Sequence, residues 1–417
     1  MMLIKKIKAI RVLDSRGVPT LKAFVYTDKA VGSAIVPSGT SSGRREAFEL
    51  RDKSNSFFGQ DVTKAISNIN TKISKELIGK SVLDQRQLDK SMIDLDRTSN
   101  KSALGANAIL SVSLASSRCA CKELGVPLYQ YLSSFSKGKL RKRMPKPILN
   151  LINGGLHAGN SLPFQEFQII PEERTISENL EAACEIYFLL KDIISKKYGN
   201  SATNVGYEGG FAPNISDPKD ALALLEQAIG KSTYTNVAIG LDCAASELYK
   251  NGSYKLGLKQ ISSQELFDYY SLVLKSYNIK SIEDPFSEDD KAPWVEFTKK
   301  FSKKLMVIGD DLLVTNPKLI SEAIKKRYCN SLLLKLNQIG TLTESIDAFN
   351  LARANFWKVV VSHRSGDSED AYVSDLAFGL ASEYCKFGAP ARSERTAKYN
   401  RLIEIEKRDI LENALIL

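Results

Sequence analysis

Acidic side chains follow three successive apolar runs in the second half of the sequence. Asp242, Glu283 and Asp310 each stand within two residues of the end of such a run. If the runs are neighbouring parallel strands, their carboxyl ends share one edge, and three carboxylates there repel one another unless a cation lies between them. Oxygen ligands with open positions favour a hard ion such as Mg²⁺. The sequence therefore predicts a divalent-cation site at these strand ends.

Basic and hydroxyl side chains follow the next two apolar runs. Lys335 comes directly after one run, and His363, Arg364 and Ser365 follow the other. Acidic metal ligands beside these groups suit a small carboxylate or phosphate as substrate. Lys335 has two open interpretations, an ion pair with one of the acids or a general base, which needs a neutral amine. A divalent cation and a second lysine, for which Lys386 is the candidate, would lower the pKa of Lys335 toward neutrality.

The elements that must position these residues alternate regularly. From residue 146 onward, short apolar runs alternate with amphipathic helical stretches. We expect a parallel-stranded β/α (TIM-like) barrel, whose chemistry occurs at the carboxyl ends of the strands. An open doubly wound sheet is the alternative, although no G-x-G-x-x-G motif opens the first unit. The runs expected to be strands are Pro147–Ile152, Phe167–Ile170, Val237–Leu241, Ile279–Ile282, Leu305–Ile308, Ser331–Leu334 and Val359–Val361.

The first part of the chain has a different rhythm. Apolar and polar residues alternate there, with a Gly- and Pro-containing turn signal at 14–20, which predicts antiparallel strands followed by helices in a small α+β domain. The Gly- and Ser-rich segment 37–43 predicts a mobile loop. The expected strands lie within 4–12, 21–25 and 31–36, and the expected helices within 62–77 and 104–124.

A basic stretch with two prolines, residues 134–147, separates these two rhythms. Its weak periodicity indicates an interdomain crossing. As a nucleic-acid patch it would need aromatic residues interleaved with the basic ones to stack on bases, and it has none, so we do not expect a nucleic-acid partner. We therefore assign an N-terminal α+β domain to residues 1–135 and a β/α barrel catalytic domain to residues 136–417.

Length and charge limit the remaining possibilities. The chain has 417 residues, a formal net charge of +10 and a calculated pI of about 9.1. That charge fits a polyanionic partner, an anionic substrate or a general use of lysine. No run of about 18 apolar residues could span a membrane and no secretion signal opens the chain, so we expect a cytoplasmic protein. The six cysteines form no C-x-x-C pair and predict neither disulfides nor a metal site.

Beyond these patterns, a series of motifs resembles the enolase family. The motifs occur nearly end to end and in the family's order. The resemblance implies an α/β protein with a C-terminal β/α barrel of the enolase type and an N-terminal α+β domain. The motifs are Ser15–Gly17, Pro37–Gly43, Asn153–Asn160, Gln165–Phe167, Glu208–Asn214, Gly240–Ala244, Glu283–Phe286, Gly309–Leu312, Leu334–Thr341, Ser362–Gly366 and Gly388–Arg395.

The resemblance implies a reaction and a metal requirement. Enolases catalyse the reversible dehydration of 2-phosphoglycerate to phosphoenolpyruvate, a hydro-lyase step of glycolysis and gluconeogenesis. Two Mg²⁺ ions per active site are implied. Asp242, Glu283 and Asp310 would hold the first ion, and Ser41 of the predicted loop would be a ligand of the second.

The resemblance also implies the catalytic residues. Lys335 would remove the proton α to the carboxylate, Glu208 would protonate the departing 3-hydroxyl, and Glu166 would support it. His157 would close over the substrate with its loop, and His363 would lie near the phosphate. Since Glu208 must be protonated to act as an acid, we expect negative charge from Glu166 or the phosphate to raise its pKa.

Substrate contacts follow from the same resemblance. Arg364 and Ser365 would face the phosphate, and Lys386 would contact the carboxylate side. The implied substrate-binding residues are His157, Gln165, Glu166, Glu283, Asp310, Lys335, Arg364, Ser365 and Lys386.

The sequence departs from the family's pattern at a few positions. Tyr207 stands where an Asp usually precedes the acid glutamate, and Leu156 replaces a small polar residue. Val18 replaces the usual Asn of the first turn, and Arg44 and Arg45 alter the predicted mobile loop. These departures bear on rate and loop dynamics and leave the assignment of roles unchanged.

One departure concerns assembly. Enolase dimers typically pair a glutamate in the second N-terminal strand with an arginine near the C-terminus, and these positions here hold Lys22 and Glu404. Reversing both signs preserves the attraction, so we expect a homodimer or a higher homo-oligomer. Two unrelated surface charges are the alternative.

Two other functions remain open from the sequence. A sugar-acid dehydratase or a racemase of the enolase superfamily would carry a K-x-K base motif on an early strand and lack the His-Arg-Ser triplet, and here the reverse holds. A non-catalytic relative that binds a polyanion would have little reason to keep every catalytic position filled.

Overall fold

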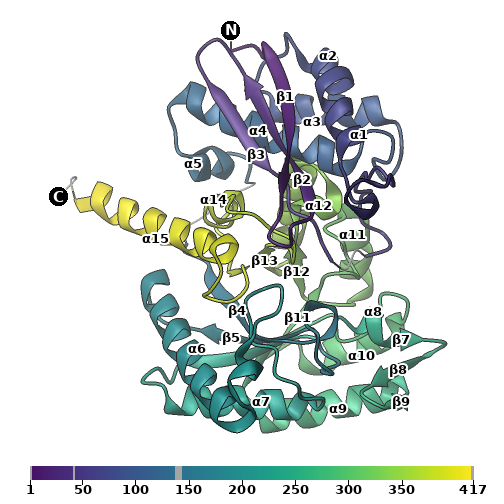
Figure 1. The fold of residues 1–417 in the computed structure, drawn as a ribbon, viewed down its shortest axis with the longest axis vertical. Coiled ribbons are helices and arrows are strands. Elements are labelled where there is room, and N and C mark those ends of the chain that lie inside the picture. Colours follow the sequence, from purple (N-terminus) through teal and green to yellow (C-terminus); the bar gives the residue numbers. More distant parts are fainter. Residues whose placement is uncertain (1, 41–42, 137–142, 415–417) are drawn as a thin grey trace.

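The computed structural model describes residues 2–40, 43–136 and 143–414, and side chains as far as residue 408. The predicted metal ligand Ser41 and part of the predicted interdomain stretch lie outside the described residues. An antiparallel sheet with helices forms the N-terminal part, and a closed barrel surrounded by helices forms most of the remainder (Figure 1). The exact domain boundary at 135/136 stays a prediction.

Three antiparallel strands form the N-terminal sheet, as predicted. Alternation along the strands places side chains such as Ile7 and Leu21 in the core. Asp14 closes the first turn, because its Oδ1 accepts hydrogen bonds from the backbone N–H groups of Arg16 (2.8 Å) and Val18 (3.1 Å). In sheet order the strands are β1(Lys6–Leu13), β2(Pro19–Tyr26) and β3(Val31–Ile35).

Helices pack against this sheet, and the longest approaches β3 closely. A Cβ atom at Gly32 would lie 2.1 Å from the carbonyl oxygen of Ala115, so only glycine fits there. Both predicted helical regions are confirmed, although the first contains a π-helical turn, η2(Ile69–Ile73). The elements of this part are η1(Ser56–Gly59), α1(Thr63–Asn68), α2(Ser74–Leu77), α3(Gln85–Asp96), α4(Ala106–Leu124) and α5(Leu128–Ser133).

Eight strands close into a barrel, in the order β10-β11-β12-β13-β14-β4-β5-β6. All seven predicted runs form strands of this barrel. The eighth strand, β14, was not predicted, because its three residues contain too short an apolar run to give a signal. The strands are β4(Lys146–Asn153), β5(Glu166–Pro171), β6(Val237–Asp242), β10(Ile279–Glu283), β11(Met306–Gly309), β12(Ser331–Leu334), β13(Lys358–Ser362) and β14(Tyr384–Lys386).

The prediction of a wholly parallel barrel is wrong for one strand. β5 runs antiparallel to both β4 and β6, with Glu166 opposite Asn153 and Asp242. The segment joining β4 to β5 contains only the 3₁₀ turn η3(Gly155–His157) and no crossover helix, so the chain turns back at the same rim. The reversal places the first residue of β5, Glu166, at the rim where the parallel strands end.

Helices cover the outside of the barrel (Figure 1), and some begin with caps that the sequence encodes. Thr175 and Ser262 each form a capping box with the glutamate three residues later, at the starts of α6 and α9. Within the described ranges, no helix is long and apolar enough to cross a membrane. The helices are α6(Ile176–Tyr198), η4(Asn200–Thr203), α7(Pro218–Lys231), α8(Ala245–Leu248), α9(Ser263–Ser276), α10(Lys291–Phe301), α11(Pro317–Lys326), α12(Leu336–Ile339), α13(Leu342–Ala354), α14(Tyr372–Gly379) and α15(Ser393–Ala414), and a small sheet contains β7(Tyr249–Lys250), β8(Ser253–Leu256) and β9(Lys259–Ile261).

Apolar side chains from the barrel strands form a separate buried cluster. The cluster draws its residues from seven of the eight barrel strands, with two of them on β11, which indicates that their side chains meet inside the barrel and fill it. The polar residues at the strand ends therefore lie on a packed floor. The cluster contains Ile148, Ile170, Ala238, Met306, Ile308, Leu333, Val360 and Tyr384.

Candidate active site

The predicted acids and lysines lie at one rim of the barrel. Asp242 ends β6, Glu283 ends β10 and Lys386 ends β14, and all three are buried. Asp310 follows β11 and Lys335 follows β12 directly. Strand ends of a β/α barrel are where catalytic groups converge, and here they bring both charge types together.

Lys386 lies among three buried carboxylates. Its Nζ is 2.9 Å from both oxygens of Glu283, 3.1 Å from Oδ2 of Asp242 and 3.1 Å from Oε2 of Glu166. Burial alone would lower the pKa of Lys386, but these carboxylates outweigh it and raise the pKa well above its usual value. Lys386 is therefore a fixed cation in an acidic pocket.

Lys335 pairs with a different acid. Its Nζ contacts Oδ2 of Asp310, whose Oδ1 accepts a hydrogen bond of 2.7 Å from Nε2 of Gln338. Burial lowers the pKa of Lys335, but the charge of Asp310 opposes it and the net shift is upward. The ion pair prevails over the opposing charges of Arg364 and Lys386. The predicted decrease in the pKa of Lys335 depends on a divalent cation beside the amine and stays a prediction.

The donor set fits a divalent metal. Asp242 and Glu283 share one ammonium group, and burial together with the charge of Asp242 raises the pKa of Glu283 well above its usual value. A hard cation compensates excess negative charge on buried oxygen ligands. The closest groupings of potential ligand atoms among the described residues, each within 4.8 Å, are nevertheless His157–Glu166–Glu208 and Asp284–Asp310–Asp311. The predicted trio is less close than these, and its members contact the two lysine amines.

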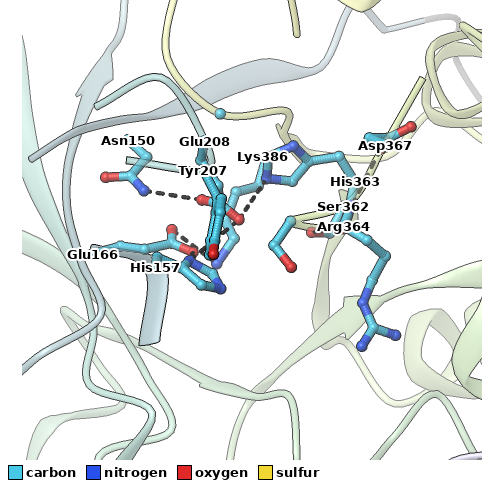
Figure 2. Close-up of polar contacts among 12 residues, drawn as sticks. Asn150, His157, Glu166, Tyr207, Glu208, Ser362, His363, Arg364, Asp367 and Lys386 are labelled. Carbon is cyan, nitrogen blue, oxygen red and sulfur yellow. Dashed lines mark hydrogen bonds and ion pairs between the residues drawn. The ribbon is translucent and has the colours of Figure 1, made fainter. Parts of the chain in front are cut away.

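A second cluster surrounds Glu208 (Figure 2). Nδ2 of Asn150 donates a hydrogen bond of 2.9 Å to Oε2 of Glu208. Nε2 of His363 lies 3.3 Å and Nδ1 of His157 lies 3.5 Å from the other oxygen, Oε1. Nδ1 of His157 is also 3.7 Å from Oε1 of Glu166. Both predicted histidines therefore face the predicted acid.

The two glutamates of this cluster have opposite pKa shifts. Burial and the charge of Glu208 raise the pKa of Glu166 well above its usual value. Burial also acts to raise the pKa of Glu208, but His157 and His363 outweigh it and the pKa falls well below its usual value. The predicted increase in the pKa of Glu208 is therefore wrong for the substrate-free protein, because its histidine contacts prevail over the nearby carboxylate.

The groups predicted to face phosphate lie beside the N-terminal loop. Nη1 and Nη2 of Arg364 donate to the carboxylate of Glu46 at 2.9 and 3.1 Å, and Nη1 also donates to Oδ1 of Asn337 at 2.9 Å. Oγ of Ser365 accepts a hydrogen bond of 2.8 Å from the backbone N–H of Thr40. Contacts from the N-terminal part thus border this side of the barrel mouth.

One small cavity joins most of the predicted residues. Its volume is about 10 Å³, about the size of one water molecule, because the charged side chains contact each other directly. The cavity leaves out Asp242, Glu283 and Asp310, which lie against the lysines. Its lining residues are His157, Gln165, Glu166, Glu208, Lys335, Ser362, His363, Arg364, Ser365 and Lys386.

The departures from the family's pattern border the neighbouring cavities. Leu156 and Tyr207 line a cavity of about 430 Å³ that also contacts His157. Val18 and Arg44 line a cavity of about 610 Å³ on the side of Arg364. These substitutions therefore change the surroundings of the site and leave its charged groups in place.

Some residues of the site carried no predicted role. Asn150 holds Glu208, and Gln168 donates a hydrogen bond of 2.8 Å to Glu166. Both are polar residues within otherwise apolar strands, which was an available signal because a buried polar side chain needs a partner. Gln338, which donates to Asp310, was harder to predict as a site residue, since it lies outside the strand.

Comparisons with known proteins agree with this geometry. The family model described as "Enolase, C-terminal TIM barrel domain" matches residues 141–415, and "Enolase, N-terminal domain" matches residues 4–132. A protein named "Enolase" from Methanosarcina barkeri is 49% identical over 408 residues, which cover 97% of this chain and 94% of that relative.

Proposed function

The chain belongs to the enolase family and is a phosphopyruvate hydratase, and from that premise we propose how its buried residues carry out the reversible dehydration of 2-phosphoglycerate. The observation that carries the proposal is the meeting of Lys335, Lys386, Glu166 and Glu208 around one buried cavity. Removing an α-proton and a β-hydroxyl from one small molecule needs a base and an acid in this kind of proximity.

Enolase activity depends on a divalent metal, and we propose two Mg²⁺ ions in this protein. Asp242, Glu283 and Asp310 would hold one ion, and Ser41 would contribute to the other. When bound, the ions stabilise the negative charge that develops on the substrate carboxylate. Lys386 contacts two of these carboxylates and would neutralise the same side of the substrate.

Lys335 is the proposed base at the α-carbon. It can accept a proton only as the neutral amine, and its contact with Asp310 raises its pKa. Activity therefore requires that this ion pair be weakened when the site is loaded. Lys335 follows β12 directly and lines the cavity, so its backbone is fixed at the barrel mouth while the partner of its amine changes.

Glu208 is the proposed acid for the departing hydroxyl. It lies in the same group of potential ligands as Glu166, with ligand atoms within 4.8 Å, and the raised pKa of Glu166 makes that residue the better proton holder in the free protein. We propose that Glu166 supplies the proton that Glu208 delivers. Two carboxylates with separated pKa values are the usual basis for distinct acid and base roles.

The remaining polar groups bind and enclose the substrate. Arg364 and Ser365 would bind the phosphate, which would replace the Glu46 carboxylate as the acceptor from Arg364 and Oγ1 of Thr40 as the acceptor from the Ser365 hydroxyl. Gln165 lines the same cavity. His157 and His363 flank Glu208 and would exclude water from the acid.

An assay of turnover tests the proposal directly. With 2-phosphoglycerate and Mg²⁺, product formation is expected in a coupled assay, and a chelator should abolish it. Lys335→Ala should lose turnover and stay folded. A folded Lys335→Ala protein with full activity would contradict the role of the base. A sugar-acid dehydratase, a racemase or a polyanion-binding relative has no comparable support, since the 49% identity covers 97% of the chain.

We propose a homodimer in the cytoplasm, where glycolysis takes place. Glu404 is exposed (66% of its side chain) and accepts a hydrogen bond of 3.0 Å from Arg401, and Lys22 is half-buried on β2, so both charges lie at the surface. Lys22→Glu alone should weaken the dimer in sedimentation, and adding Glu404→Lys should restore it. Equal dissociation of the single and double variants would show that these charges do not pair.

A further inference from the structure

A fully buried arginine lies behind His363. Arg395, in the first turn of α15, has an exposed fraction of 0%. Its guanidinium donates to the carbonyl oxygens of Arg364 (2.6 Å), Ser365 (2.6 Å) and Tyr207 (3.0 Å). It therefore joins the segment with the proposed phosphate-binding groups to the segment that carries the proposed acid.

The same guanidinium determines which ring nitrogen of His363 carries the proton. Nη1 of Arg395 lies 2.6 Å from Nδ1 of His363. Arginine has only donors, so Nδ1 must accept, and the proton of the neutral ring must lie on Nε2. Nε2 lies 3.3 Å from Oε1 of Glu208. The ring thus turns an N–H group toward the carboxylate of the acid, although the alignment falls short of a hydrogen bond in this structure.

The charge of Arg395 also disfavours a protonated ring. Burial lowers the pKa of His363 to about 4, and Arg395 acts in the same direction, against the attraction of Glu208. A neutral imidazole with its proton on Nε2 can donate a hydrogen bond but is a poor proton source near neutral pH. Proton delivery is then left to Glu208.

Close packing holds these groups together. A Cβ atom at Gly388 would lie 2.8 Å from the carbonyl oxygen of Glu208, 2.9 Å from Cδ of Arg395 and 3.0 Å from Cε1 of His363. Three segments therefore meet with no room for a methyl group. The imidazole has little freedom to turn away from the acid.

We infer that Arg395 is a positioning residue that fixes His363 as the neutral tautomer protonated on Nε2 and aimed at Glu208. The catalytic consequence rests on the proposed role of Glu208 as the acid. The tautomer itself is a property of the ring and can be measured without turnover.

The protein has only two histidines, which makes the measurement simple. In protein labelled with ¹⁵N-histidine, nitrogen NMR at neutral pH should show His363 with an unprotonated Nδ1 and a protonated Nε2, and a His157→Gln variant assigns the signals. A protonated Nδ1 of His363 in the unaltered protein would overturn the inference, even if every arginine variant failed to fold.

Substitution of Arg395 separates positioning from simple packing. Arg395→Met should mix the tautomers of His363, raise its pKa and lower kcat roughly 10- to 100-fold with a smaller change in KM for 2-phosphoglycerate. Arg395→Lys, which keeps a charged donor, should recover part of kcat. A folded Arg395→Met protein with unchanged His363 signals would overturn the inference.

A matched control comes from a partly buried arginine whose side chain is 25% exposed. Arg118 donates 2.7 Å hydrogen bonds to both oxygens of Asp370 and one of 2.8 Å to the carbonyl of Ser33. Arg118→Met should cost stability and leave the His363 signals unchanged. If Glu208→Gln keeps full turnover while His363 has the inferred tautomer, the proposed acid is wrong and the inference about Arg395 stands.

Discussion

The two halves of the barrel mouth compensate buried charge in opposite ways. Around Lys386, the carboxylates of Asp242, Glu283 and Glu166 share one ammonium group. Around Glu208, the amide of Asn150 and two imidazoles face the carboxylate, and Glu166, which also contacts Lys386, lies beside it. The first half needs a cation, whereas in the second Asn150 donates the hydrogen bond and two imidazole nitrogens lie near the carboxylate without bonding to it.

This difference separates two adjacent acids. Glu166 faces Lys386 yet has a raised pKa, because burial and the charge of Glu208 prevail. Glu208 has a lowered pKa, because its histidine contacts outweigh burial. The carboxylates around Lys386 can therefore exchange one cation for another, while the residues around Glu208 control a proton. Mutations should then separate the metal requirement from the acid step.

Removal of the shared ammonium should have the largest effect. Lys386→Met leaves three buried carboxylates without their cation, so the free energy of unfolding should fall by about 3–5 kcal/mol in metal-free buffer, and turnover should be lost. Added Mg²⁺ should restore part of the stability, since it compensates the same carboxylates. Urea unfolding with and without Mg²⁺ measures both effects.

Lys398 provides the control for that change. It is also buried, and its Nζ contacts Oδ1 of Asp367 at 3.1 Å and two backbone carbonyls away from the proposed metal ligands. Lys398→Met should therefore lose stability without the Mg²⁺-dependent recovery. Equal recovery of both variants would show that Mg²⁺ does not act at the carboxylates around Lys386.

Substitution of Glu208, in the second half, should lower the rate of turnover and hardly change the free energy of unfolding. Glu208→Gln keeps a group of the same shape that can still accept from Asn150, but it cannot deliver a proton, so kcat should fall roughly 100- to 10,000-fold. The Mg²⁺-dependent gain in stability should remain, because the other half is intact. A variant that loses this gain together with kcat would mean that the halves are not independent.

The position of the first half, around Lys386, could be predicted from the sequence. Asp242, Glu283 and Lys335 stand at or directly after apolar runs, and a barrel brings such strand ends to one rim. The chemistry of the second half gave less signal. Glu208 lies between strands, and its pKa depends on contacts with His157 and His363, which no local pattern shows.

The direction of a strand and the ion-pair partner of a side chain were harder to predict than the position of either in the sequence. The apolar run of β5 gave a strand but not its antiparallel direction, which depends on how the segment after β4 turns back. Lys335 pairs with Asp310 and Lys386 with Glu283 because of their places around the closed barrel. The order of strands around the barrel cannot be read from their spacing along the chain, because closure places the last strand, β14, beside the first, β4.

The smallest predicted effect concerns pH and only the second half. The pKa of His363 falls from 6.5 to about 4 on folding, so the unfolded chain binds more protons between these pH values and stability should decline as pH falls through this window. Between pH 7 and pH 5 the difference amounts to about 2 kcal/mol. His363→Gln removes the titrating group and should flatten the decline, as measured by urea unfolding at pH 7 and pH 5. Identical slopes in both proteins would mean that the histidine is not held neutral, and the contrast between the two halves would then rest on Glu208 alone.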